Sequence, residues 1–220
     1  RWQNTRWCLV RIPTAALAQQ AEVDRSTLTE MFFDACLLDW EAASLDWRAL
    51  ADRFEAASQV RILGVETDLR FSVAGRRWVV LDGRLNMPDG EIFTAPVNAT
   101  LNGTITFELP AVYGGRTLTG VRLRWEDGEL IEATSATHQA YLHEILRSDA
   151  GDSRLGEFGI GTNPAVTHYC KDSLLDEKIG GTVHIALGRA YPQAGGKNRS
   201  AIHWDLVKDL RRGGRLLLDG

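Results

Sequence analysis

DEKIGGTVHIALGRAYPQAGGKNRSAIHWD, residues 176–205, contains two short apolar runs separated by a glycine-rich segment. The first run, Thr182–Leu187, is rich in β-branched residues and is flanked by glycines. This composition is typical of a buried β-strand, and the strand carries one polar side chain, His184. We therefore expect a histidine inside the protein at this point.

The second run, Ala201–Leu206, carries His203 and Asp205 two residues apart. Side chains alternate between the two faces of a strand, so both polar groups are expected on one face, with Ile202 and Trp204 packed on the other. An imidazole and a carboxylate then converge. Asp205 can bind a metal ion or orient His203 in such an arrangement.

The composition of the whole chain fits one compact domain, residues 1–220. Its formal net charge is −4, which gives no basis for binding nucleic acid. Three widely spaced cysteines, Cys8, Cys36 and Cys170, form neither a disulfide framework nor a zinc knuckle, so the reducing cytoplasm is the expected location. The sequence contains no run of about 18 apolar residues, which argues against membrane insertion. It does not begin with Met, so we expect a fragment or a processed chain.

Helical and strand patterns occupy different parts of the chain. Amphipathic spacing predicts a helix capped by Ser26 and a second helix over about Glu41–Ala57. After these come short β-rich runs, with a hairpin at Asp127-Gly128 and another between Leu206 and Leu218. We predict an α+β fold with a mixed, largely antiparallel sheet or a partly closed barrel, flanked by helices.

Five residues in turns or at strand ends are candidates for chemistry: Glu91, Glu157, His184, His203 and Asp205. Carboxylates and imidazoles together suit zinc, cobalt or manganese, and a carboxylate-rich set suits two ions that share a ligand. Such a pair can activate water, so hydrolysis is the expected reaction class. Each residue also has a simpler interpretation, because a glutamate after Asp-Gly is typical of a turn and a lone strand histidine is typical of a hydrogen-bonded core.

Five motifs in order resemble the aminopeptidase T family: NMPDGEIFTAP, EFGIGTNP, DEKIGGTVHIALG, AYPQAGGKN and SAIHWD. Members of that family usually begin with a separate α/β domain, so we expect the chain to correspond to their C-terminal metal-binding domain alone. The resemblance implies peptide substrates, a homodimer and two divalent ions, whether Zn, Co, Mn or Mg. By motif, the implied ligands are Glu91, Glu157, His184, Tyr191, His203 and Asp205.

The function that follows is a metal-dependent aminopeptidase, which removes N-terminal residues from peptides. Glu177 is a candidate general base, and Tyr191 a candidate ligand or stabiliser of the tetrahedral oxyanion. A structural alternative for Glu177 is pairing with Lys171 or Lys178. The competing function is an isolated metal-binding or interaction domain that has no activity on its own.

Overall fold

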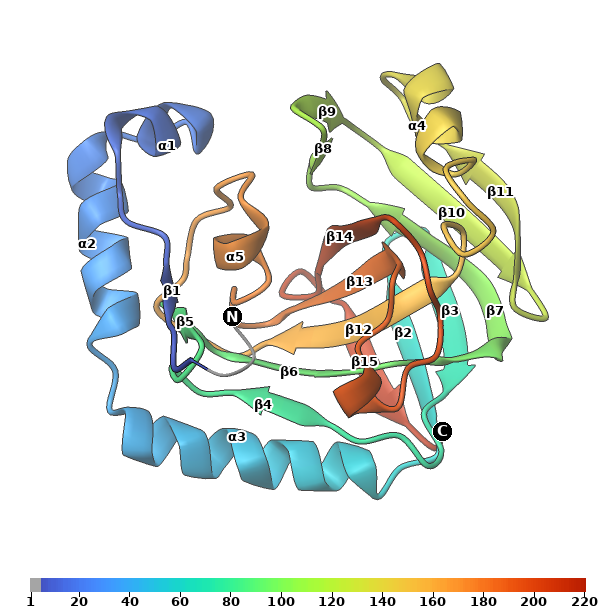
Figure 1. Ribbon diagram of the computed structural model, residues 1–220, viewed down its shortest axis with the longest axis horizontal. Coiled ribbons are helices and arrows are strands. Elements are labelled where there is room, and N and C mark those ends of the chain that lie inside the picture. Colours follow the sequence, from blue (N-terminus) through green and yellow to red (C-terminus); the bar gives the residue numbers. More distant parts are fainter. Residues whose placement is uncertain (1–4) are drawn as a thin grey trace.

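Two antiparallel sheets form the centre of the protein in the computed structural model, which describes residues 5–220 (Figure 1). The five-stranded sheet has the order β14-β13-β12-β6-β4 (His203–Asp209, Thr182–Gly188, Leu155–Gly161, Glu91–Thr94, Val79–Leu81). The six-stranded sheet has the order β11-β10-β7-β3-β2-β15 (Glu129–Thr134, Val121–Glu126, Val97–Phe107, Thr67–Ser72, Gln59–Gly64, Arg215–Leu218). Every neighbouring pair in these two sheets is antiparallel.

The inner faces of the two sheets share one hydrophobic core. Phe71 of β3 meets Phe158 of β12 edge to face, with ring centroids 5.1 Å apart. The indole of Trp125 on β10 is completely buried in the same core, which also receives Ile185 of β13. Because aromatic pairs of this geometry add to the gain from apolar burial, they hold the two sheets together.

Helices cover the edges of the sheets (Figure 1). Helix α3 (Trp40–Glu55) is capped by Asp39, runs along β4 and buries Trp47 and Phe54. Helices α1 (Ala15–Gln20) and α2 (Arg25–Cys36) form a second small core with α5 (Ser173–Asp176). Helix α4 (Gln139–Ile145) packs on β11, and a 3₁₀ turn covers Pro192–Ala194. Two short pairs complete the fold: β1 (Leu9–Val10) with β5 (Asn86–Met87), and β8 (Ala111–Tyr113) with β9 (Arg116–Leu118).

This architecture confirms the predicted α+β class with largely antiparallel sheets. The two large sheets stay separate across residues 5–220 and do not close into a barrel. The hairpin at Asp127-Gly128 joins β10 to β11, and both turn residues have positive φ, as a tight hairpin requires. None of the helices in this described range is long and apolar enough to cross a membrane.

Two local predictions were wrong. The C-terminal residues do not form a hairpin, because β14 belongs to the five-stranded sheet whereas β15 pairs with β2 of the other sheet. The turn at Gly213, with φ of +84°, carries the chain from one sheet to the other. The cap of α2 is Asp24 and not Ser26, since an Asp24 carboxylate oxygen accepts from the backbone N–H of Thr27 at 2.9 Å.

Candidate metal centre

Glu157 faces away from the core because β12 contains a bulge at Gly156. The register with β13 shifts between Leu155 and Glu157, so Leu155 pairs with Leu187 and Glu157 with the adjacent Ala186. Without an extra residue, two positions this far apart would share one face of the strand. With it, Leu155 lies in the hydrophobic core while the Glu157 carboxylate lies on the opposite face of the sheet.

Three other strands supply the remaining candidates to that same face. On β13, the two neighbours of His184 lie in the core, and the imidazole itself is completely buried. On β14, Trp204 packs in the core while His203 and Asp205 lie on the other face, which is the alternation expected from the sequence. Glu91 is the first residue of β6.

Small residues leave room for these side chains. Gly159 of β12 lies opposite His184, and a Cβ built at Gly159 would be only 2.1 Å from the Nε2 atom of the imidazole. Ala186 of β13 pairs with both Glu157 on one side and Asp205 on the other. Larger residues at Gly159 and Ala186 would therefore take up space that the polar side chains now occupy.

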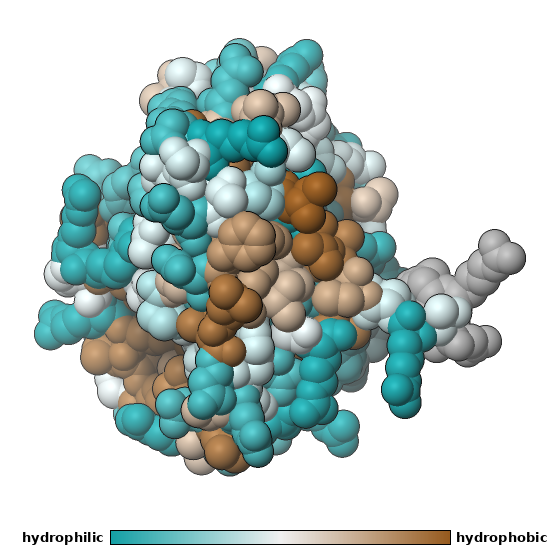
Figure 2. Space-filling model, turned by 90° about the vertical axis from the view of Figure 1, so that its left-hand side faces the viewer, coloured by the Kyte–Doolittle hydropathy of each residue, from teal (hydrophilic) through white to brown (hydrophobic). Residues whose placement is uncertain are grey.

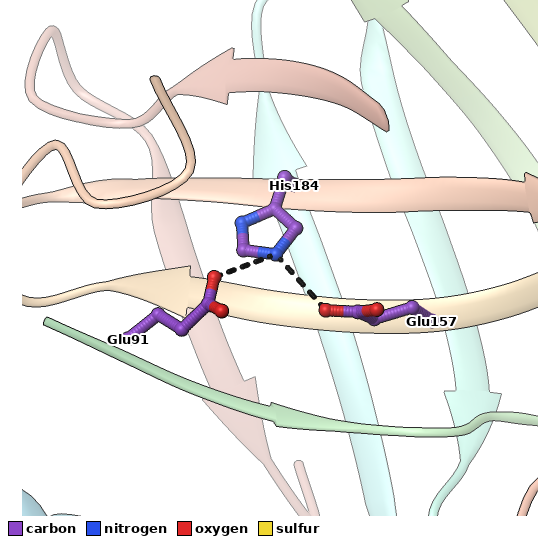
Figure 3. A group of neighbouring side chains, drawn as sticks. All are labelled: Glu91, Glu157 and His184. Carbon is purple, nitrogen blue, oxygen red and sulfur yellow. Dashed lines mark hydrogen bonds and ion pairs between the residues drawn. The ribbon is translucent and has the colours of Figure 1, made fainter. Parts of the chain in front are cut away.

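The first group of candidate ligands is Glu91, Glu157 and His184 (Figure 3). The Nε2 atom of His184 lies 3.3 Å from Glu91 Oε2 and 3.3 Å from Glu157 Oε1. One ligand atom from each residue lies within 4.8 Å of the other two. All three residues are buried, and they come from the neighbouring strands β6, β12 and β13.

The second group is Glu157, His203 and Asp205. The Nε2 atom of His203 lies 3.5 Å from Glu157 Oε2 and 3.5 Å from Asp205 Oδ1. Glu157 thus belongs to both groups, with one oxygen directed to each. A carboxylate between two sets of ligands is the arrangement expected of a pair of ions that share a bridging group.

Hydrogen bonding fixes the ring orientation of His203. Its Nδ1 atom lies 2.8 Å from the carbonyl oxygen of Arg189. A carbonyl only accepts hydrogen bonds, so Nδ1 carries the proton, and in the neutral ring Nε2 presents its lone pair to the carboxylates. The Nδ1 atom of His184 is buried and has no such partner among residues 5–220.

Burial and the neighbouring negative charges disfavour ionisation of the carboxyl groups in this region. Burial, and then the charges of Glu91 and Glu177, raise the pKa of Glu157 well above its ordinary value. Burial and the charge of Glu157 raise the pKa of Asp205 to about 6. Burial and the charge of Asp205 likewise raise the pKa of Glu177. Each shift opposes ionisation, so the ionised cluster needs positive charge.

The unpaired atoms of the cluster fit divalent cations. Glu91 Oε2 and Asp205 Oδ1 are buried and accept no hydrogen bond from the part of the chain that the structure describes. Such atoms are costly unless a cation or another donor satisfies them. Oxygen and imidazole nitrogen together are ligands that zinc, cobalt and manganese accept.

The structure brings the two candidate catalytic residues next to the ligand groups. The ring of Tyr191 lies 5.0 Å from that of His203, centroid to centroid, and packs edge to face. Glu177 is the C-cap residue of α5, and its Oε2 atom lies 3.4 Å from Lys178 Nζ. Lys171 instead pairs with Glu22, so of the two partners considered from sequence only Lys178 reaches Glu177. The roles of Tyr191 and Glu177 stay predictions.

Sequence reasoning missed two contributors to the site, Asp89 and Gly159, and considered Lys178 only as a partner of Glu177. Asp89 and Lys178 have no exposed side-chain surface, and their charged groups lie 3.8 Å apart. The available signal was that each charged residue lies next to a candidate site carboxylate, in Asp-Gly-Glu and Asp-Glu-Lys. For Gly159 no signal was available, because its importance depends on the residue across the sheet.

Comparison with known proteins agrees with this geometry. The model of the thermophilic metalloprotease (M29) family matches residues 2–213. The chain belongs to this family. Membership of this metalloprotease family implies that the chain uses divalent metal, and the two groups of side chains described above are its candidate ligands.

Several M29 relatives are aminopeptidases. The chain is 32% identical to aminopeptidase T of Thermus thermophilus over 76% of its own length and 46% of that protein. It is 26% identical to aminopeptidase 2 of Geobacillus stearothermophilus over 84% of its length and 51% of that protein. The chain therefore spans about half the length of the curated relatives it matches.

Solved structures show the same fold. Wild-type AmpT from Thermus thermophilus superposes with a TM-score of 0.75 at 26% identity, over 88% of this chain and 54% of AmpT. A 2,5-dihydroxypyridine dioxygenase from Pseudomonas putida KT2440 superposes with a TM-score of 0.68 at 16% identity, over 95% of this chain and 66% of that one. The second likeness is one of fold alone.

Proposed function

We propose that the chain carries the metal centre of a dinuclear metallo-aminopeptidase that removes N-terminal residues from peptides. The observation that supports this most directly is the position of Glu157, whose two oxygens face His184 and His203 separately. We propose two divalent ions, of zinc, cobalt, manganese or magnesium, held by the two groups of ligands, with Tyr191 completing the set.

When bound, the ions would polarise the scissile carbonyl and activate water. Glu157 would hold both halves of the site together, and His203 would keep its Nε2 lone pair available through the bond from Nδ1 to the Arg189 carbonyl. The Glu177 carboxylate would accept a proton from the attacking water and return it to the departing amine. Burial raises the pKa of Glu177, and a carboxylate that holds a proton more firmly suits a group that takes up a proton and returns it.

Substrate would approach from the side of His203. The side chain of His203 is 15% exposed and that of Asp205 is 9% exposed, whereas His184 is completely buried. The hydroxyl of Tyr191, whose ring borders His203, would then be placed to bind an ion or to stabilise the oxyanion.

We further propose that residues 1–220 act as one metal-binding unit that forms a homodimer in the cytoplasm. Figure 2 shows apolar residues gathered on the face that carries α1 and α2. The exposed apolar residues of α2 and β1 include Phe33, Leu9 and Val10, and surfaces of this kind favour association. The cysteines Cys8, Cys36 and Cys170 are free, as is usual in a reducing compartment.

One observation favours the alternative, a metal-binding domain that is inactive alone. A groove with a volume of about 1010 Å³ is lined by α3, β15 and the ends of β12 and β13, and none of the candidate ligands lines it. The substrate cleft would then depend on protein beyond this chain.

Peptide hydrolysis by the metal-reconstituted chain tests the choice. We expect release of N-terminal residues from short peptides and loss of that activity in Glu157→Gln. A chain that binds two ions but cleaves no peptide favours the binding domain, and a chain that binds no divalent ion refutes both.

A further inference from the structure

Lys178 lies inside the carboxylate cluster although an ammonium group is no metal ligand. Its side chain has no exposed surface. The Nζ atom lies 2.7 Å from Glu91 Oε1, 3.4 Å from Glu177 Oε2 and 3.8 Å from Asp89 Oδ1. A lysine is rarely buried in this way unless carboxylates compensate for its lost hydration.

The two carboxylate oxygens of Glu91 have different partners. Oε1 is bound by Lys178, whereas Oε2 lies 3.3 Å from His184 Nε2 and accepts no hydrogen bond in the described chain. A free carboxylate can rotate and offer both oxygens to one ion. Here one oxygen is already engaged, and only the other is directed toward Glu157 and His184.

Backbone hydrogen bonds hold Lys178 in position. The N–H of Asn163 donates to the carbonyl of Lys178 at 3.0 Å, and the N–H of Lys178 donates to the carbonyl of Leu175 at 3.1 Å. The side-chain amide of Asn163 also donates to the carbonyl of Asp89 at 2.7 Å. One buried asparagine thus ties together the two segments that carry the ammonium and one of its carboxylates.

We infer that Lys178 is a positioning residue, which makes Glu91 present a single oxygen to the ion shared by Glu91, Glu157 and His184. The inference rests on the metal centre of the proposed function and not on the peptidase reaction. Lys178 acts through Glu91, so its removal weakens that ion and leaves the ion at His203 and Asp205 in place.

Metal binding by Lys178→Met, measured by calorimetric titration with cobalt, tests this. We expect one of the two ions to bind about 10- to 100-fold more weakly, the usual effect of losing a group that orients a ligand. In a Glu91→Gln background, Lys178→Met should have little further effect, because the group that it orients is already changed. A reduction of the same size in both backgrounds would show that Lys178 does not act through Glu91.

Lys208 of β14 provides a matched control, because its ammonium group lies beside the six-stranded sheet and not in the carboxylate cluster. It is also almost completely buried, and its Nζ atom bonds Glu108 and the carbonyls of Val65 and Thr106. Lys208→Met should lower thermal stability and leave the affinity for both ions unchanged. Equal loss of metal affinity in the Lys178 and Lys208 variants would overturn the inference.

An infrared measurement on the parent protein keeps the inference testable if Lys178→Met does not fold. The carboxylate band that changes on cobalt binding in the parent and is missing in Glu91→Gln belongs to Glu91. We expect the band separation of a carboxylate bound through one oxygen. A separation typical of two bound oxygens refutes the role of Lys178, whereas a parent protein that binds no cobalt refutes the metal centre itself.

Discussion

Gly159→Ala tests whether the imidazole of His184 depends on the missing side chain across the sheet. A Cβ at this position would lie 2.1 Å from Nε2 and 2.3 Å from Cε1 of His184, whereas ordinary contacts begin at 3.4 Å. The difference between 2.1 and 3.4 Å means that the ring must withdraw by about 1.3 Å. Ligand distances in metal sites tolerate only about 0.2 Å, so a displaced ring no longer binds the ion.

The expected result is loss of one ion with a moderate loss of stability. Changes outside the ligand set cost about 10- to 100-fold in metal affinity, so removal of a ligand should cost more than about 100-fold. Crowding a filled interior by one methyl group should lower the free energy of unfolding by about 1–3 kcal/mol. The His203 and Asp205 group should keep its ion, because its contacts do not include Gly159.

Competition between the protein and a calibrated chelator measures both affinities. In Gly159→Ala/His184→Ala the added methyl group no longer meets a ring, so the double variant should bind metal like His184→Ala alone. Gly75→Ala is the control for stability. Its φ of +70° makes the substitution strain the backbone, but the added Cβ would meet no atom within 4 Å, so it should lower stability without changing metal affinity. Unchanged affinity for both ions in Gly159→Ala would refute the assignment of His184 as a ligand.

Three further outcomes are expected. His203→Ala should weaken the ion at Asp205 and spare the one at Glu91 and His184, as metal titration would show; equal weakening of both would contradict two separate groups. In the metal-free protein, burial raises the pKa of Asp205 from 3.8 to about 6, so the folded state holds this proton more tightly than the unfolded state. The free energy of unfolding should therefore fall as pH rises from about 4 to about 6, and Asp205→Asn should reduce this fall in calorimetry. Light scattering should give the mass of a dimer at micromolar concentration, and a monomer would contradict the proposed assembly.

Local patterns in the sequence predicted the strands of the site well. The alternation around His203 and Asp205 depends only on the two-residue period of a strand, and Trp204 is buried on the opposite face as expected. His184 likewise follows from a polar residue in an apolar run, and the strand that carries it is buried throughout. Properties that depend on neighbouring residues alone could be predicted from the sequence.

Properties that depend on pairing between distant segments could not. The bulge at Gly156 decides which face Glu157 occupies, but it is defined by the register with β13 and not by residues around it. The C-terminal residues have the pattern of a hairpin, yet the free edge of β2 is where β15 pairs. Gly159 matters only because His184 lies opposite it.

The balance of charge explains why these distant segments must meet. The cluster contains the carboxylates Asp89, Glu91, Glu157, Glu177 and Asp205 and the ammonium of Lys178. When every group is ionised, about four negative charges remain, which is the charge that two divalent cations neutralise. Burial of this many carboxylates is unfavourable without cations, and the raised pKa values of Glu157, Glu177 and Asp205 express that cost. Lys178 satisfies the one oxygen of Glu91 that faces away from the ligands, so the remaining charge is directed toward the space between His184 and His203.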